Sequence, residues 1–115
     1  MSLARSSAAG RGPELARHEV PDIDAAALTA AHAVDVALRE ARSIDAVRWV
    51  RYLEPLPDRL RDDGLRELRS TARRVRAAFG PKDSIRDSLP DAVTEPMLIT
   101  VDRLLKAIAR HDAQG

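Results

Sequence analysis

The sequence contains no cysteine among its 115 residues. Disulfide bonds, thiol nucleophiles and zinc sites built on cysteine are therefore excluded, and this composition suits a reducing compartment such as the cytoplasm. No apolar run approaches the roughly 18 residues that a membrane-spanning helix needs. We accordingly expect a cytoplasmic protein that has no membrane among its partners.

Aromatic residues are also scarce: they make up 3% of the chain and consist of Trp49, Tyr52 and Phe79. The core must therefore be built from leucine, isoleucine, valine and alanine, and the abundant alanine, leucine, glutamate and arginine are strong helix formers. The five glycines are scattered, so the sequence has no phosphate-binding loop and no dinucleotide-binding fingerprint.

The charges are nearly balanced, with 19 basic and 18 acidic residues and a formal net charge of +1. Such a chain has no overall field that attracts nucleic acid or an anionic membrane. Its length corresponds to one domain with one modest core. Residues 1–21 show no sustained hydrophobic periodicity, so we expect a flexible N-terminal arm there and a single helical-bundle domain over 22–115.

Apolar residues recur at helical spacing in four segments, which predicts helices over approximately 23–42, 44–54, 58–79 and 94–111. No strand signal competes, and a chain without sheets buries such faces by packing helices against one another. The sequence therefore predicts an all-α fold, namely a small antiparallel bundle of three to four helices with a disordered N-terminal arm.

The boundary between the first two predicted helices is ambiguous. Ser43 is placed to cap the second helix, and Pro55 and Pro57 are placed to end it. The apolar faces of the two segments are rotated relative to each other. Either the chain breaks near Ser43, or one long helix contacts different neighbours along its length.

The ends of the other helices are marked more clearly. Gly64 weakens the middle of the third predicted helix, so the turns before it are either the start of that helix or a separate short piece. Gly80 is followed by Pro81, a pair that predicts a helix end with glycine in the left-handed conformation. Thr94 predicts the cap of the last helix.

The predicted core combines the apolar faces of these helices. The face of the first helix consists largely of small residues and is suited to close approach of a neighbour. The predicted core positions are Ala27, Leu28, Ala31, Val34, Leu38 and Ala41 in the first helix, Ala46, Val47, Trp49, Val50 and Leu53 in the second, Leu65, Leu68, Ala72, Val75 and Phe79 in the third, and Leu98, Val101, Leu105 and Ile108, widened by Met97 and Leu104, in the last.

The third predicted helix carries five arginines. Four of them, Arg66, Arg69, Arg73 and Arg76, recur at spacings of three and four and form a row along one flank of the apolar face; we call them the arginine row. Their stems can cover the edge of the core while the guanidinium groups reach water. Alternatively, the row binds an acidic protein partner, including the acidic helix 22–40 of a second copy, or it binds nucleic acid. A local basic patch on a near-neutral chain is a weak indication of nucleic-acid binding.

Trp49 and Tyr52 lie three residues apart in the second predicted helix. The first interpretation is that both belong to the core or its edge, with the tyrosine hydroxyl in contact with water. The second is that they anchor a protein interface, because both residue types are enriched at interaction hot spots. Tryptophan is usually largely buried, which favours the first interpretation.

The three histidines give little support to a metal site. His18 follows Glu14 by four residues and His32 precedes Asp35 by three, so either pair can share a helix face, whereas His111 has no such partner. The repeated Glu-x-x-His pairs of di-metal bundles are absent. No pair of carboxylates at core positions indicates an acid–base catalyst. We expect no metal, no cofactor and no catalytic residue.

These observations favour a non-enzymatic module that acts by binding another protein or by self-association as a homodimer or other homo-oligomer. The alternative is a nucleic-acid-associated regulator that uses the arginine row. A third hypothesis is a small all-helical enzyme whose arginines bind an anionic substrate.

Overall fold

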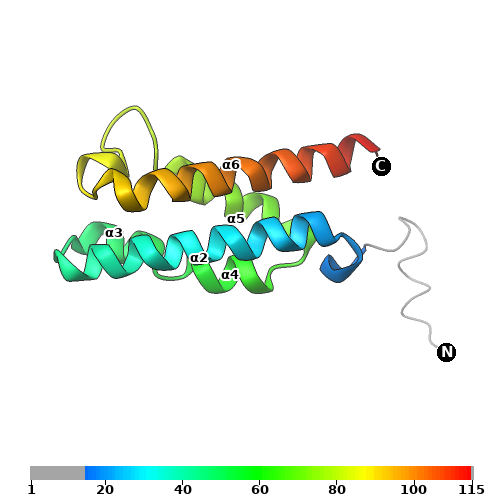
Figure 1. Ribbon diagram of the computed structural model, residues 1–115, viewed down its shortest axis with the longest axis horizontal. Helices are drawn as coiled ribbons and strands as arrows, with labels where there is room; N and C mark the ends of the chain where they lie inside the picture. The colour runs from blue at the N-terminus through cyan, green and yellow to red at the C-terminus, as the bar shows by residue number, and fades with distance from the viewer. Residues whose placement is uncertain (1–14, 115) are drawn as a thin grey trace.

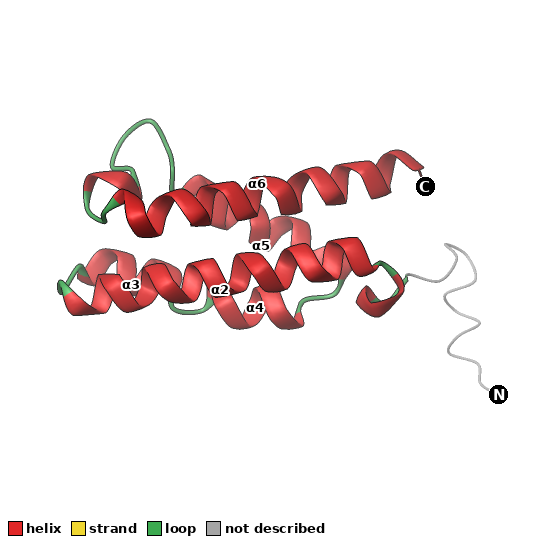
Figure 2. Ribbon diagram, in the orientation of Figure 1, coloured by secondary structure: helices red, strands yellow, loops and turns green. Residues whose placement is uncertain are grey.

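The computed structural model describes residues 15–114 of the chain, and these residues form helices without a strand (Figure 2). The α-helices are α2 (Pro21–Ser43), α3 (Val47–Leu53), α4 (Leu56–Asp62), α5 (Leu65–Ala77) and α6 (Asp91–Gln114), and two short 3-10 helices are η2 (Arg17–Glu19) and η3 (Ile85–Asp87).

The helices form an antiparallel bundle (Figure 1). α2 and α5 run in one direction, whereas α3, α4 and α6 run in the other, so that α3 and α4 together take the place of one broken helix. α2 makes its most extensive contacts with α6 and also contacts α3 and α4, while α5 packs against α4 and α6. The predicted all-α antiparallel bundle is therefore confirmed.

The long helix α2 is the centre of the core, and its buried face is rich in alanine. Alanine side chains at five positions of α2 are fully buried, namely Ala27, Ala30, Ala31, Ala37 and Ala41. Such small side chains let neighbouring backbones approach closely, which confirms the prediction of a small-residue packing face. Leu28 differs from its predicted place in the core and is 47% exposed, because it lies outside the arc that α6, α3 and α4 cover.

The chain breaks between α2 and α3, so the two segments are separate helices. Ala46 N–H donates to the carbonyl of Ala41 at 2.9 Å and Asp45 N–H to that of Arg42 at 3.3 Å, while Asp45 adopts a φ of 55°. This is the Schellman arrangement, in which one residue after the helix end is left-handed. α3 consequently begins at Val47, later than the predicted start, and Ser43 ends α2 instead of capping α3.

We expect replacement of Asp45 by glycine to stabilise the fold. The left-handed conformation costs a residue with a Cβ about 1–2 kcal/mol, and glycine avoids this cost. The greater freedom of glycine in the unfolded chain cancels part of that gain. Asp45→Gly should therefore raise the free energy of unfolding by about 0.5–1 kcal/mol, as measured by urea denaturation. Ala25→Gly, at an exposed position inside α2, is the contrasting variant and should lower stability by about 1 kcal/mol. Equal destabilisation by both substitutions would contradict this account.

The third predicted helix, 58–79, is two helices in the structure. The break lies at Asp63 and Gly64, whose ψ angles of 140° and 170° are extended. The Asp63 carboxylate accepts a hydrogen bond from the buried Thr71 hydroxyl and lies 3.8 Å from Arg59. Pro57 lies in the first turn of α4, where proline is tolerated, so it helps to begin this helix instead of ending the previous one.

Arg17 binds the end of α4 and so holds the first described residues against the break between α4 and α5. Its Nη1 donates to the carbonyl oxygens of Leu60, Arg61 and Asp63 at 2.7, 2.8 and 3.0 Å, and its Nε donates to the Asp24 carboxylate at 3.0 Å. The flexible arm predicted over residues 1–21 lies mostly outside the described residues. Arg17 was predicted to lie in this flexible arm, but the structure shows it held by hydrogen bonds. The reason is that the carbonyl groups in the last turn of α4 have no donor within the helix.

The last helix begins earlier than predicted, at Asp91. Thr94 is not its cap: the residue is fully buried within α6, and its hydroxyl donates to the carbonyl of Pro90 at 3.3 Å. Gly80 has no left-handed φ, because α5 ends three residues earlier in a tight turn in which Ala78 N–H bonds the Val75 carbonyl at 3.1 Å.

The buried face of α6 is centred on Met97, Val101, Leu104 and Ile108. Leu98 and Leu105, predicted to lie in the middle of this face, are half-buried at its edge. Among the helices described here, none combines the length and the apolar character that crossing a membrane requires.

Candidate functional site

The arginine row lies on the flank of α5 that faces α6. Arg69 forms an ion pair with Asp112, and the Nε of Arg76 donates to the Asp102 carboxylate at 3.0 Å. Arg66, in the first turn of α5, is exposed. The row therefore borders the line where α5 and α6 meet, and two of its members bind acids of the neighbouring helix.

Arg73 lies between Arg69 and Arg76 on α5 but, unlike them, is not paired with an acid of α6. No hydrogen bond or ion pair joins it to another residue in the described part of the chain. Arg69 and Arg76 are seven positions apart, about 10 Å along α5, whereas Asp102 and Asp112 are ten positions apart, about 15 Å along α6. The two ion pairs thus enclose a stretch of α6 in which no acid faces Arg73.

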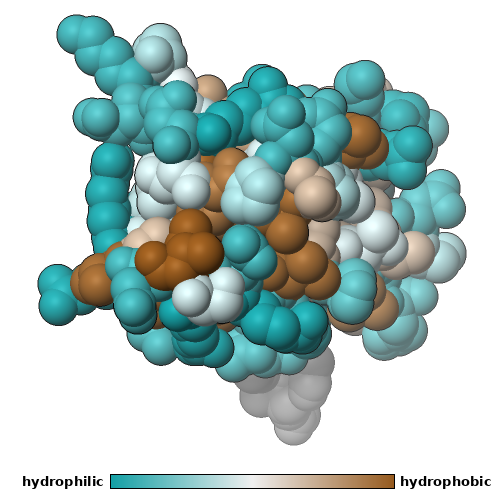
Figure 3. All heavy atoms as spheres, turned by 60° about the vertical axis from the view of Figure 1, so that its left-hand side comes forward, coloured by the Kyte–Doolittle hydropathy of each residue, from teal (hydrophilic) through white to brown (hydrophobic). Residues whose placement is uncertain are grey.

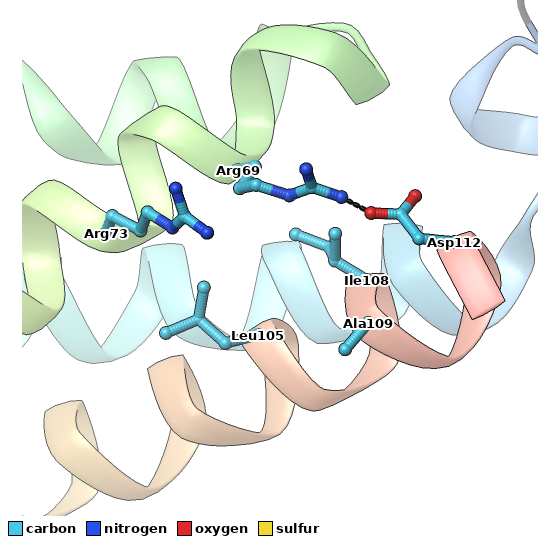
Figure 4. A pocket seen from close by; sticks show the side chains of 6 residues that line it. All are labelled: Arg69, Arg73, Leu105, Ile108, Ala109 and Asp112. Carbon is cyan, nitrogen blue, oxygen red and sulfur yellow. Dashed lines mark ion pairs between the residues drawn. The ribbon is translucent and has the colours of Figure 1, made fainter.

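A groove of about 480 Å³ opens at this place, between α5 and α6. Its lining consists of Arg69, Arg73, Leu105, Ile108, Ala109 and Asp112 (Figure 4). Figure 4 shows Arg69 reaching toward Asp112, while Arg73 extends on the side of Leu105 and meets no carboxylate among the residues drawn. The groove therefore combines an aliphatic floor with one paired and one unpaired guanidinium group, an arrangement that suits an anion attached to an apolar body.

The remaining arginine of α5, Arg74, points toward the aromatic pair. Its guanidinium lies 4.6 Å from the centre of the Tyr52 ring, and the Tyr52 hydroxyl donates to its carbonyl at 2.5 Å. Trp49 is only 4% exposed and contacts Tyr52 edge to face, with ring centres 5.4 Å apart. Tyr52 thus joins α3 to α5, and Trp49 offers almost no surface to a partner.

Exposed apolar side chains gather elsewhere, at the end of the bundle where α2 ends and α6 begins. Ile44 and Val47, in the connection between α2 and α3, are 46% and 58% exposed. Figure 3 shows brown atoms in the middle of this end, surrounded by teal ones. This patch lies at the opposite end of the bundle from Asp112, in the last turn of α6.

Two of the four acids of helix 22–40, the predicted ligand for the arginine row in a second copy, have partners within their own chain. Asp24 lies 2.9 Å from Arg17, and Asp35 forms an ion pair with Arg61. The hydrogen bond to Asp35 raises the pKa of Arg61 above its ordinary value. These two carboxylates are therefore less available to another copy.

The histidines do not come together. His18 and His32 are exposed on η2 and α2, and His111 is half-buried on α6. Glu14, the potential neighbour of His18, lies outside the described residues. Within residues 15–114, no three histidine, aspartate or glutamate side chains are arranged to hold a metal ion.

The sequence predicted the arginines on the α5 side of this groove but not the residues that line it on the α6 side. Leu105 and Ile108 were expected only as core residues, and Asp102 and Asp112 were not singled out. A signal for the two acids is present, because they lie on the same flank of α6 as Leu105 and Ala109. Their pairing with arginines depends on the register between two antiparallel helices, which the spacing within one helix does not contain.

Comparisons with known proteins found no match: no family model matches the sequence, and no curated protein or solved structure does. The groove itself is therefore the basis for a functional assignment.

Proposed function

We propose that this protein is a small, non-enzymatic interaction module that binds an acidic segment of a partner protein in the α5–α6 groove. The observation that carries the proposal is the unpaired guanidinium of Arg73, set between two arginines that do have acidic partners. A carboxylate is the natural complement of that group. The aliphatic floor formed by Leu105, Ile108 and Ala109 favours a segment in which an acidic residue is followed by an apolar one.

The nucleic-acid alternative has less support. Arg69 and Arg76 are already neutralised by acids of α6, and a phosphate backbone is bound by several free cations along its length. Trp49 is buried, so it provides no stacking platform for bases. The enzymatic alternative has less support too, because Asp112, the acid in the groove, is held in an ion pair with Arg69. We place the proposed interaction in the cytoplasm, as the cysteine-free composition suggests.

Removal of the Arg73 side chain should weaken binding strongly. The probe is a short helical peptide with glutamate and leucine spaced four residues apart on one face, and the control peptide has glutamine in place of glutamate. Since a hydrogen bond to a charged group contributes about 1.5–3 kcal/mol, Arg73→Ala should raise the dissociation constant of the glutamate peptide about tenfold or more. Fluorescence anisotropy with labelled peptide measures it.

The matched control is Arg51→Ala, which removes the same charge from an exposed position on α3. Its dissociation constant should stay within about twofold of the original, because only long-range charge is changed. Equal weakening by both variants, or equal binding of the two peptides, would contradict the proposal. Arg73-dependent binding of a DNA or RNA duplex that falls steeply with salt would favour the nucleic-acid alternative, and concentration-dependent dimerisation lost in Arg73→Ala would identify a second copy as the occupant.

A further inference from the structure

We infer that Asp112 is an internal competitor for the groove, so that a partner carboxylate binds by taking the place of Asp112 on Arg69 while it also contacts Arg73. This inference rests on the proposed function and specifies the ligand further: the partner must present its carboxylate where that of Asp112 now lies.

The ion pair that the partner must replace is a weak one. The Arg69 and Asp112 side chains are 41% and 48% exposed, and exposed ion pairs contribute only about 0–1 kcal/mol. Asp112 also lies in the last turn of α6, two residues before its end at Gln114. Helix ends fray, so a side chain there can move away without disturbing the core.

The position of Asp112 is also unfavourable for the helix that carries it. The C-terminal end of a helix bears a partial negative charge and favours cations, so a carboxylate in the last turn is destabilising there. Arg69 offsets this effect. Replacement of Asp112 by a neutral residue should therefore change the stability of the fold very little, which separates a role in binding from a role in folding.

Asp112 affects binding in two ways. It occupies Arg69, and its own negative charge repels any anion that enters the groove beside Arg73. Without that charge, Arg69 and Arg73 are both free to bind one ligand carboxylate. The ligand that fits is an acidic residue with a neighbouring aliphatic side chain, the latter seated on Leu105 and Ile108.

The test compares Asp112→Asn with Asp102→Asn. Both variants replace an aspartate of α6 that pairs with an arginine of α5 by a neutral residue of the same shape, but only Asp112 lines the groove. For the labelled glutamate peptide, Asp112→Asn should lower the dissociation constant on the order of fivefold. Asp102→Asn should change it less than about twofold, since a more distant charge is screened. The thermal midpoints of both variants, followed by circular dichroism, should stay close to that of the original protein.

An equal gain in both variants would show a bulk charge effect and would overturn the inference, as would unchanged or weaker binding in Asp112→Asn. If the original protein binds the peptide and Arg73→Ala does not, but Asp112→Asn gains nothing, then the proposed function stands and the exchange of Asp112 is refuted. If neither the original protein nor Asp112→Asn distinguishes the glutamate peptide from the glutamine peptide, both proposals fail. Binding that emerges only in Asp112→Asn supports the inference.

Discussion

Arg17→Ala should destabilise the protein by about 3 kcal/mol, because it removes a largely buried cation that binds three carbonyl groups. The Arg17 side chain is 10% exposed, and its Nη1 donates to carbonyl oxygens at the end of α4 and at the break that follows. Those carbonyls lie at a helix end and have no intrahelical donor. Without Arg17 they must bind water at a partly enclosed place, and Asp24 loses its cation.

The control for this prediction is Arg42→Ala. Arg42 also pairs with an acid, Glu54, but the two side chains are 54% and 61% exposed, so the loss should be below about 1 kcal/mol. Urea denaturation followed by circular dichroism measures both variants. Arg17→Lys should recover only part of the loss, because one ammonium group does not reproduce the geometry of the guanidinium. A loss for Arg17→Ala no greater than that for Arg42→Ala would show that Arg17 does not hold the end of α4.

Ala30→Leu should destabilise the protein by about 2–3 kcal/mol through overpacking of the core. Ala30 is fully buried in α2, and the helix is enclosed by α3, α4 and α6. The added carbons must displace neighbouring side chains or separate two helices. Leucine and alanine have similar helix propensities, so the expected loss reports on packing between helices and not on α2 itself.

Ala25→Leu is the matched substitution on the exposed side of the same helix. It should change the free energy of unfolding by no more than about 0.5 kcal/mol. Thermal unfolding of the two variants at equal concentration gives the comparison. Near-equal stability of both would mean that α2 and its neighbours are loosely packed and have room for the larger side chain.

Hydrophobic periodicity predicted the helices and their antiparallel arrangement, but for the break at Asp63 and Gly64 it left open whether the first turns belong to the third helix or form a separate helix. The four residues between Leu60 and Leu65 are charged residues and glycine, a gap that a continuous helix and a broken one can both contain. The break is held by contacts that are distant in sequence, above all the hydrogen bond from Arg17 to the Asp63 carbonyl. Local spacing does not reveal such a contact, because it forms only when the first turn of the chain lies against the end of α4.

The arginine row was predicted correctly as a flank of α5, whereas the proposed function depends on which of its arginines lacks an acid among the described residues. A helical wheel treats Arg69, Arg73 and Arg76 alike. The structure distinguishes them, because Asp102 and Asp112 are ten residues apart and leave the middle position unmatched. Similarly, Leu105 was placed in the core by its spacing, but it lies at the edge of the buried face, where it lines the groove.

The pairing of α2 with α6 has a consequence for the newly made chain. The ribosome completes α2 at Ser43 but completes its main neighbour only at Gln114, a delay of about 4–14 s at roughly 5–20 residues per second. During this interval the packing face of α2 is incompletely covered. Its alanines expose far less apolar surface than leucines do, and the attraction between apolar surfaces scales with their area. A packing face dominated by alanine therefore limits the apolar surface that α2 exposes before α6 has been synthesised, and so limits aggregation.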